Sequence, residues 1–172
     1  QTLLAAVALA AACGGDQPPT SASQALGPVV ETAAGTLEGA YADSSEEMLV
    51  FRGVAFAKAP VGELRWRPPE APESWEGARS ATANGLPCWQ PLTPETSIYS
   101  RGQIERSEDC LFLNLWTAAE SRDDRLPVMV WFHGGGHRTG HGGSRVFNGA
   151  ALAQKGVVLV SANYRLGAFG FM

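Results

Sequence analysis

The chain lacks several features that would place it in other classes of protein. It carries 13 Lys and Arg against 17 Asp and Glu in 172 residues, a formal charge of −4. Such a mildly acidic chain has no broad basic face for a nucleic-acid backbone. Its apolar run at residues 3–12 is too short to cross a bilayer as a helix. With 45% hydrophobic and 17% charged residues it is neither disordered nor fibrous, and its length suits one domain or a piece of a larger one.

The N-terminal residues resemble an export signal. Residues 3–12 (LLAAVALAAA) fit the apolar region of a secretory signal peptide, and Cys13 follows three alanines as the lipidated cysteine of a bacterial lipobox does. An ordinary cleaved signal with an incidental cysteine is the alternative. We expect residues 1–13 to be the signal and 14–28 a flexible linker, in an exported cell-envelope lipoprotein or secreted protein with a possible membrane tether through Cys13. Because the chain begins with Gln and stops after a predicted strand and turn, we expect a piece of a longer protein.

Two further cysteines support export. Cys88 and Cys110 would close a loop of 23 residues, and loop-closure entropy gives such a bridge a stabilisation of roughly 3 kcal/mol. Two unrelated buried thiols are the alternative. Because oxidising compartments favour disulfides, export favours the bridge.

The body of the chain has the pattern of an α/β protein. Short strands are predicted at Val29–Glu31, Thr36–Glu38 and 48–52, followed by a long irregular, proline-rich stretch over 57–103. Three near-continuous apolar runs then suit strands buried on both faces of a parallel or mixed sheet, at 111–116, Val128–Phe132 and 157–162. A short helix is predicted over 149–155, with Asn148 as its N-terminal cap and Gly156 closing it.

The segment after the second apolar run, WFHGGGHRTGHGGS at 131–144, admits three interpretations. A phosphate-binding loop is disfavoured because neither G-x-G-x-x-G nor a Walker lysine is present. A metal site would use His133, His137 and His141, whose spacing of four suits one helix face. The glycines between them disfavour a helix, and the segment contains no carboxylate or cysteine.

The third interpretation is an oxyanion hole. Attack on an ester carbonyl places negative charge on oxygen, and preorganised backbone N–H groups stabilise it. Glycines let adjacent amides turn inward and let a substrate approach closely. His-Gly-Gly-Gly after a strand is typical of lipases and esterases, although a flexible glycine-rich turn is the alternative.

Four motifs in order resemble the type B carboxylesterases, the cholinesterase-like family. They are FRGVAFA with PVGELRW at 51–57 and 60–66, SEDCLFLNLW at 107–116, HGGG at 133–136, and NYRLGAFGF at 163–171. The resemblance covers residues 29–172 and implies the N-terminal part of an α/β-hydrolase domain, whose central sheet is mixed and mostly parallel and is incomplete in this chain. It also implies an exported bacterial serine esterase that acts on small carboxylic esters and needs no cofactor or metal.

The resemblance also assigns residues. Gly135 and Gly136 would supply two oxyanion-hole amides, supported by Gly134, and the third amide would follow the nucleophile. Cys88 and Cys110 match the first disulfide of the family, and Arg65 and Glu108 match a structural ion pair. Arg165 matches an arginine whose acidic partner lies further along, with a solvated surface charge as the alternative.

The chain also departs from the family. His137 stands where an aromatic residue is common, and Ala55 where proline is usual. No serine lies in G-x-S-x-G, so the nucleophile, acid and base are expected beyond residue 172, and His133 is not assigned as the base. This fragment is therefore expected to be inactive. A non-catalytic adhesion module of the same fold is the alternative function, and the intact glycine loop favours the enzyme.

The missing strand has a physical consequence. The strand that carries the nucleophile should pair beside 128–132, so without it an apolar edge is left open to aggregation. We expect residues 29–172 alone to be insoluble or molten, and a cooperative melt of a monomer would refute this.

Overall fold

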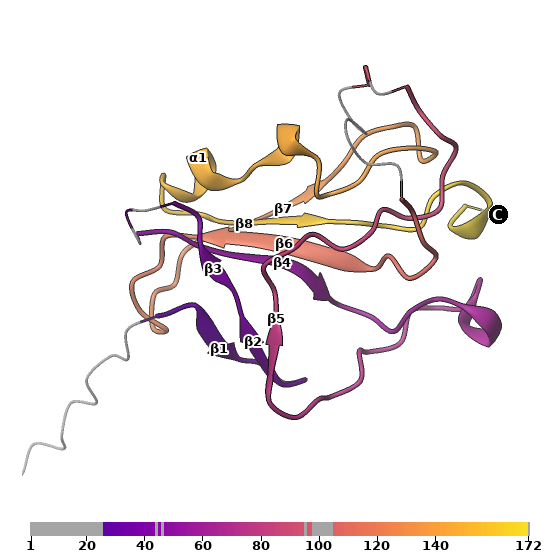
Figure 1. Cartoon of the computed structure of the whole chain (residues 1–172). Helices are drawn as coiled ribbons and strands as arrows, with labels where there is room; N and C mark the ends of the chain where they lie inside the picture. Colours follow the sequence, from indigo (N-terminus) through magenta and orange to yellow (C-terminus); the bar gives the residue numbers. More distant parts are fainter. Residues whose placement is uncertain (1–25, 44, 46, 95, 98–104, 172) are drawn as a thin grey trace, which may run out of the picture.

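A computed structural model describes residues 26–43, 45, 47–94, 96–97 and 105–171 (Figure 1). The predicted signal and most of the linker, including Cys13, lie outside these residues. The described chain forms two sheets, and Figure 1 shows the smaller one below the larger one, with the short helix on the opposite side. Within the described part no helix is long and apolar enough to cross a membrane.

The smaller sheet has the strand order β1-β2-β5. Its first two strands, β1 (Val29–Glu31) and β2 (Thr36–Glu38), are antiparallel and have the predicted bounds. The third strand, β5 (Ala78–Ser80), is parallel to β2 and was not predicted. The stretch predicted to be irregular thus contains a strand, and also a 3₁₀ helix, η1 (Gly62–Leu64). All three side chains of β5 are exposed, so it has no apolar pattern by which to recognise it.

The larger sheet has the order β3-β4-β6-β8-β7, with bounds β3 Ala40–Tyr41, β4 Leu49–Ala55, β6 Phe112–Thr117, β8 Val158–Ala162 and β7 Val128–Phe132. The sheet is mixed, as predicted. In the described part, β7 and β8 form its only parallel pair, and the other pairings are antiparallel. The predominance of parallel pairs expected of the whole domain is therefore absent from these strands.

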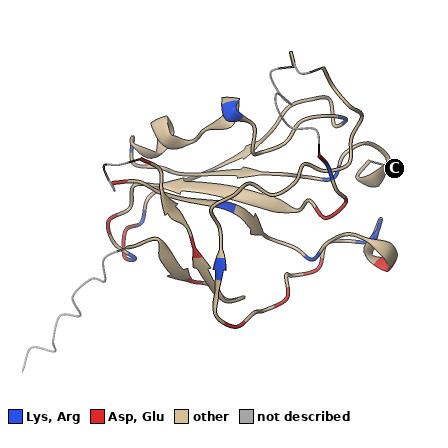
Figure 2. Cartoon of the chain, viewed as in Figure 1, with Lys and Arg blue, Asp and Glu red and all other residues tan. Residues whose placement is uncertain are grey.

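The larger sheet separates two apolar cores. Val50 of β4 packs with Trp116 and Leu159 against the helix. Its neighbours in the same strand, Leu49 and Phe51, pack with Leu37 of β2 and with Ala81, which follows β5. Alternate residues of one strand point to opposite faces, which explains why β4 serves both cores. Charged residues of both signs lie mainly in the loops around the sheets (Figure 2).

The crossover between β7 and β8 contains a 3₁₀ turn, η2 (Arg145–Phe147), and a single helix, α1 (Ala150–Ala153). The helix is shorter than the predicted span of 149–155. Gly149 is its N-terminal boundary, and the chain turns at 154–156, where Gly156 has a φ of +82°. The N-cap is thus Gly149 and not Asn148 as predicted, although Oδ1 of Asn148 accepts the amide of Ala150 at 3.0 Å.

Strand β7 lies at the edge of the larger sheet. All five of its side chains are exposed, by 45–64%, which corrects the expectation of a strand buried on both faces. Strand β8 pairs with one side of β7, and no described strand pairs with the other. The apolar run of β7 has the pattern of a central strand, but the other described residues cover only part of the surface of β7.

Candidate active site

The glycine loop, residues 133–143, begins at the carboxyl end of β7. Gly135 and Gly136 have φ values of +124° and +60°, and Gly140 has +109°, all in the region that favours glycine. The carbonyl of Gly135 accepts the amides of Arg138 and Thr139 at 3.1 and 3.2 Å, which closes a tight turn. A Cβ on Gly135 would lie 1.9 Å from the carbonyl oxygen of Thr139, whereas one on Gly136 would meet nothing within 4 Å.

Two adjacent amides of this loop are unpaired. Among the described residues, the N–H groups of Gly135 and Gly136 donate to no acceptor. Gly136 is exposed and Gly135 half-buried. Adjacent N–H groups without a protein partner on an ordered loop can donate to a charged oxygen without rearrangement.

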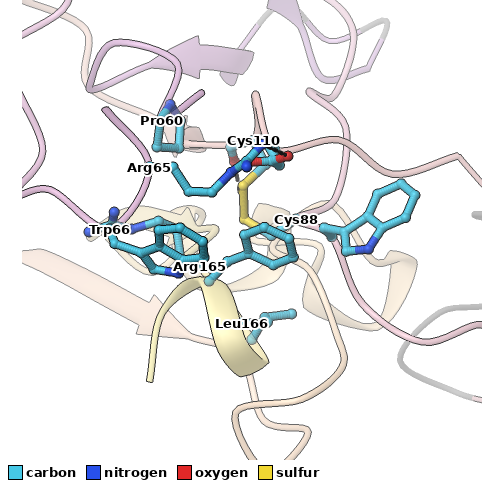
Figure 3. Close-up of a pocket in the computed structure, with 10 residues that line it drawn as sticks. Pro60, Arg65, Trp66, Cys88, Cys110, Arg165 and Leu166 are labelled. Atoms are coloured by element: carbon cyan, nitrogen blue, oxygen red, sulfur yellow. Dashed lines mark hydrogen bonds and ion pairs between the residues drawn. A yellow bond between two sulfur atoms is a disulfide. The ribbon is translucent and has the colours of Figure 1, made fainter. Parts of the chain in front are cut away.

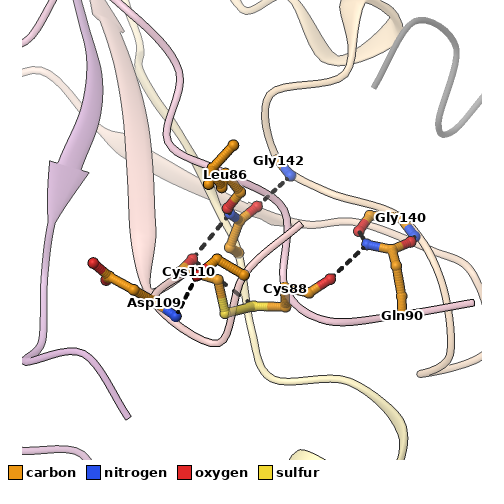
Figure 4. Close-up of a disulfide and its surroundings, with 9 residues drawn as sticks. Leu86, Cys88, Gln90, Asp109, Cys110, Gly140 and Gly142 are labelled. Carbon is orange, nitrogen blue, oxygen red and sulfur yellow. Dashed lines mark hydrogen bonds between the residues drawn. A yellow bond between two sulfur atoms is a disulfide. The ribbon is translucent and has the colours of Figure 1, made fainter. Parts of the chain in front are cut away.

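Gln90 holds the loop from one side. The Gln90 amide donates to the carbonyl of Gly140 at 2.9 Å and accepts the N–H of Gly140 at 2.7 Å, and it also donates to the carbonyl of Cys88 at 3.0 Å (Figure 4). With 9% exposure, Gln90 is nearly buried. Both polar groups of Gly140 are therefore bound by one side chain.

Residues at the end of β8 hold the loop from the other side. Asn163 accepts the N–H of Gly142 at 2.7 Å and donates to the carbonyls of Leu86 and Cys110 at 3.1 and 3.0 Å. Ser161 donates its hydroxyl to the carbonyl of Gly142 at 2.8 Å. Gln90 and Asn163 were not singled out from the sequence. The signals for them were the position of Gln90 two residues after a cysteine, and the place of Asn163 at the end of a predicted strand and the start of the motif at 163–171.

The predicted disulfide between Cys88 and Cys110 is present, with 4.8 Å between the Cα atoms (Figure 4). Both cysteines are buried, in a cluster with Ala57, Leu111 and Leu166. Through the contacts of Gln90 and Asn163, the two ends of the disulfide are connected to the glycine loop.

The three histidines of the segment occupy different environments. His133 and His141 are buried, and His137 is exposed and stacks on Phe171 with 4.3 Å between ring centres. The ring of His133 stacks on Tyr164 at 4.4 Å, and the Tyr164 hydroxyl donates to the carbonyl of His133 at 2.6 Å. No group of three metal-ligating side chains is found among the described residues.

Burial controls the charge of the inner histidines. Desolvation lowers the pKa of His141 to about 4, with a smaller contribution from the neighbouring His133. Desolvation also lowers the pKa of His133, opposed by its contact with the carbonyl of Gly134. Nε2 of His141 has no hydrogen-bond partner among the described residues. Both rings are therefore neutral near pH 7.

The predicted ion pair between Arg65 and Glu108 is present and bidentate, at 2.5 and 2.6 Å (Figure 3). The Arg65 side chain is 37% exposed and that of Glu108 23%, so the pair is half-buried. Hydrogen bonding to Glu108 raises the pKa of Arg65, with desolvation opposing it and the charge of Glu108 adding to it.

Arg65, Glu108 and Arg165 line one small pocket (Figure 3). The guanidinium of Arg165 donates to the carbonyl of Arg67 at 2.9 Å. No acidic side chain among the described residues forms an ion pair with Arg165.

The arrangement of strand and loop defines a class of protein. Among solved structures, the chain matches a carboxylesterase of Geobacillus stearothermophilus with a TM-score of 0.72 and 41% identity, over 84% of this chain and 28% of that one. It matches a PNB esterase with a TM-score of 0.73 and 39% identity, over 84% and 29%. The fold is therefore the N-terminal part of an α/β-hydrolase carboxylesterase.

Sequence comparison gives the family. Residues 26–172 match the family model described as "Carboxylesterase family", and the chain belongs to that family. It is 41% identical to the fumonisin B1 esterase of Sphingopyxis macrogoltabida over 84% of this chain and 25% of that one. It is 43% identical to the phenmedipham hydrolase of Pseudarthrobacter oxydans over 84% and 29%. The chain thus spans less than a third of the length of these relatives.

Proposed function

We propose that the whole protein hydrolyses carboxylic esters by a serine nucleophile located outside this chain, with Gly135 and Gly136 as oxyanion-hole donors. The observation that carries this proposal is the pair of adjacent, unpaired amides on a loop held at both ends. Membership of a family whose relatives are named esterases and hydrolases supports it.

The proposed reaction has two stages. The serine oxygen attacks the ester carbonyl carbon, and the carbonyl oxygen gains a negative charge that the N–H groups of Gly135 and Gly136 stabilise. The alcohol then leaves, and water releases the acid from the acyl-enzyme through a second such intermediate. Loss of one oxyanion donor typically lowers kcat by about 10²–10³-fold. Gly134 supports the site by leaving open space beside the donors.

The open edge of β7 suits the rest of this site. We expect the strand that leads to the nucleophile to pair with β7, which would cover its five exposed side chains. The glycine loop leaves the carboxyl end of β7, and the nucleophile would then lie at the carboxyl end of the neighbouring strand. In α/β sheets ligands bind at this edge.

The test uses the full-length gene product, with 4-nitrophenyl butyrate as substrate and a fluorophosphonate as a covalent serine probe. We expect turnover, and one probe molecule per protein on a serine downstream of residue 172. A folded full-length protein that neither hydrolyses the ester nor takes up the probe would overturn the proposal and favour the non-catalytic adhesion module.

Two alanine variants test whether activity depends on the shape of the glycine loop. Gly135→Ala should lower kcat at least 100-fold, because its Cβ would collide with the Thr139 carbonyl and displace the donors. Gly136→Ala keeps its N–H and enters open space, so it should retain activity within about fivefold and lose about 1–2 kcal/mol of stability from its positive φ. Equal activity of the two variants would contradict the assignment.

We also propose that the protein is exported and anchored by a lipid on Cys13, because the buried disulfide suits an oxidising compartment. Intact-mass measurement of the membrane fraction should show a lipid-sized increase that Cys13→Ala abolishes. A mature protein without this increase would contradict the lipid anchor and favour an ordinary cleaved signal peptide.

A further inference from the structure

An open pocket lies beside the glycine loop. It has a volume of about 360 Å³ and is lined by four separate segments of the chain. One follows the disulfide cysteine and includes Trp89 and Gln90, one is the turn that contains Phe169, and a third contributes Arg138 from the glycine loop itself. Arg106, in the fourth, completes the charged side of the pocket.

The pocket is positively charged. Two of its lining residues are arginines, and none of the described lining residues is Asp or Glu. The guanidinium of Arg106 lies over the ring of Trp89, 4.9 Å from its centre, which orients it without neutralising it. Arg138 is exposed, and neither arginine forms an ion pair within the described part of the chain.

The pocket is connected to the proposed oxyanion donors. Arg138 donates its backbone amide to the carbonyl of Gly135, which places the two residues at opposite ends of one four-residue turn. The Cα atoms at the ends of such a turn lie within about 7 Å. Gln90, which lines the pocket, is also the residue that binds Gly140. The pocket and the proposed oxyanion donors therefore share one loop.

We propose that this pocket binds a free carboxylate on the substrate, so that the enzyme prefers anionic esters such as half-esters of dicarboxylic acids. The planar guanidinium matches a carboxylate through two parallel N–H···O bonds, and Trp89 and Phe169 supply an apolar wall for the chain between carboxylate and ester. This inference rests on the proposed function and adds a substrate class to it.

The experiment compares monoethyl glutarate with ethyl valerate, two esters of equal acyl chain length that differ in the carboxylate, on the full-length gene product. Arg138→Gln should lower kcat/KM for monoethyl glutarate 10- to 100-fold and change that for ethyl valerate less than twofold. Arg106→Gln should act in the same direction. Arg145→Gln, an exposed arginine outside the pocket, is the matched control and should change neither.

Salt provides a second readout, because screening weakens an exposed ion pair. Raising ionic strength should lower kcat/KM for the anionic ester only. Equal loss of both activities in Arg138→Gln, or no effect on either, would overturn the carboxylate site while leaving ester hydrolysis intact.

A binding measurement covers the case in which no ester is hydrolysed. Isothermal titration of monoethyl glutarate into the wild-type protein should then give binding that Arg138→Gln weakens at least 10-fold. Absence of binding, or equal binding by both proteins, would overturn the pocket independently of the reaction.

Discussion

Replacing Gln90 by methionine tests how the glycine loop keeps its shape. Methionine has a similar length, so Gln90→Met removes the polar atoms and leaves little cavity. It deprives Gly140 of the partners of both its N–H and its C=O, in a buried position. The buried carbonyl of Cys88 loses its Gln90 partner as well. Each buried polar group left unpaired costs about 1–3 kcal/mol, so the three groups together give a loss of about 3–9 kcal/mol in the free energy of unfolding.

Urea unfolding of the full-length gene product measures this loss, and hydrolysis of a neutral ester reports on the site. Displacement of the loop should lower kcat about 10- to 100-fold, because reacting groups misplaced by about 1 Å lose rate on that scale. Gln90→Glu keeps an acceptor for the N–H of Gly140 and should fall between wild type and Gln90→Met.

The matched control is Asn84→Ala. Asn84 also binds the loop by a side-chain amide, but with a single exposed bond of 3.3 Å to Gly143. Its loss should change stability by no more than about 0.5 kcal/mol. If Gln90→Met is as stable and as active as Asn84→Ala, the loop does not depend on Gln90 and the reasoning is wrong.

Two further predictions concern the supports of the site. Replacing Cys88 and Cys110 together by alanine should destabilise the protein by roughly 3 kcal/mol, the loop-closure value, and reductant should then have no further effect on its unfolding; a loss below about 1 kcal/mol would contradict this. Because burial lowers the pKa of His141 to about 4, the unfolded chain, with a histidine pKa near 6.5, binds the proton first as pH falls. The contribution of neutral His141 to the free energy of unfolding is fully present above pH 6.5. It is lost, by about 3 kcal/mol, as the pH falls from 6.5 to 4. His141→Leu should reduce the fall in the free energy of unfolding between pH 6.5 and 4, measured by urea titration at several pH values. An unchanged pH dependence would refute this prediction.

The elements that the sequence predicts well are those whose signal is local. Strands β1, β2 and β7 have the predicted bounds because turn residues enclose short β-branched or apolar runs. The bridge between Cys88 and Cys110 was predicted from the export signal and matched the family, the ion pair between Arg65 and Glu108 followed from the family resemblance, and both are present.

The features that were missed depend on residues far apart in the sequence. Gln90 and Gly140 are 50 residues apart, and a single polar side chain has no periodicity to reveal its partner. The open edge of β7 was expected, but the exposure of its two faces was missed, because an apolar run does not indicate which segment covers the strand. Strand β5 forms through backbone pairing with β2, which side-chain patterns do not record.

The two halves of the proposed site are built in different ways. The glycine loop is fixed within this chain, because Gln90 and Asn163 bind it from opposite sides and the disulfide connects their supports. Such preorganised donors need no rearrangement when charge develops on the substrate oxygen. We propose that the nucleophile is instead positioned across the open edge of β7, whose side chains Val130 and Phe132 also line an apolar hollow. Burial of that surface would then couple folding of the remaining chain to assembly of the site, so damage to β7 should abolish activity without altering any residue of the glycine loop.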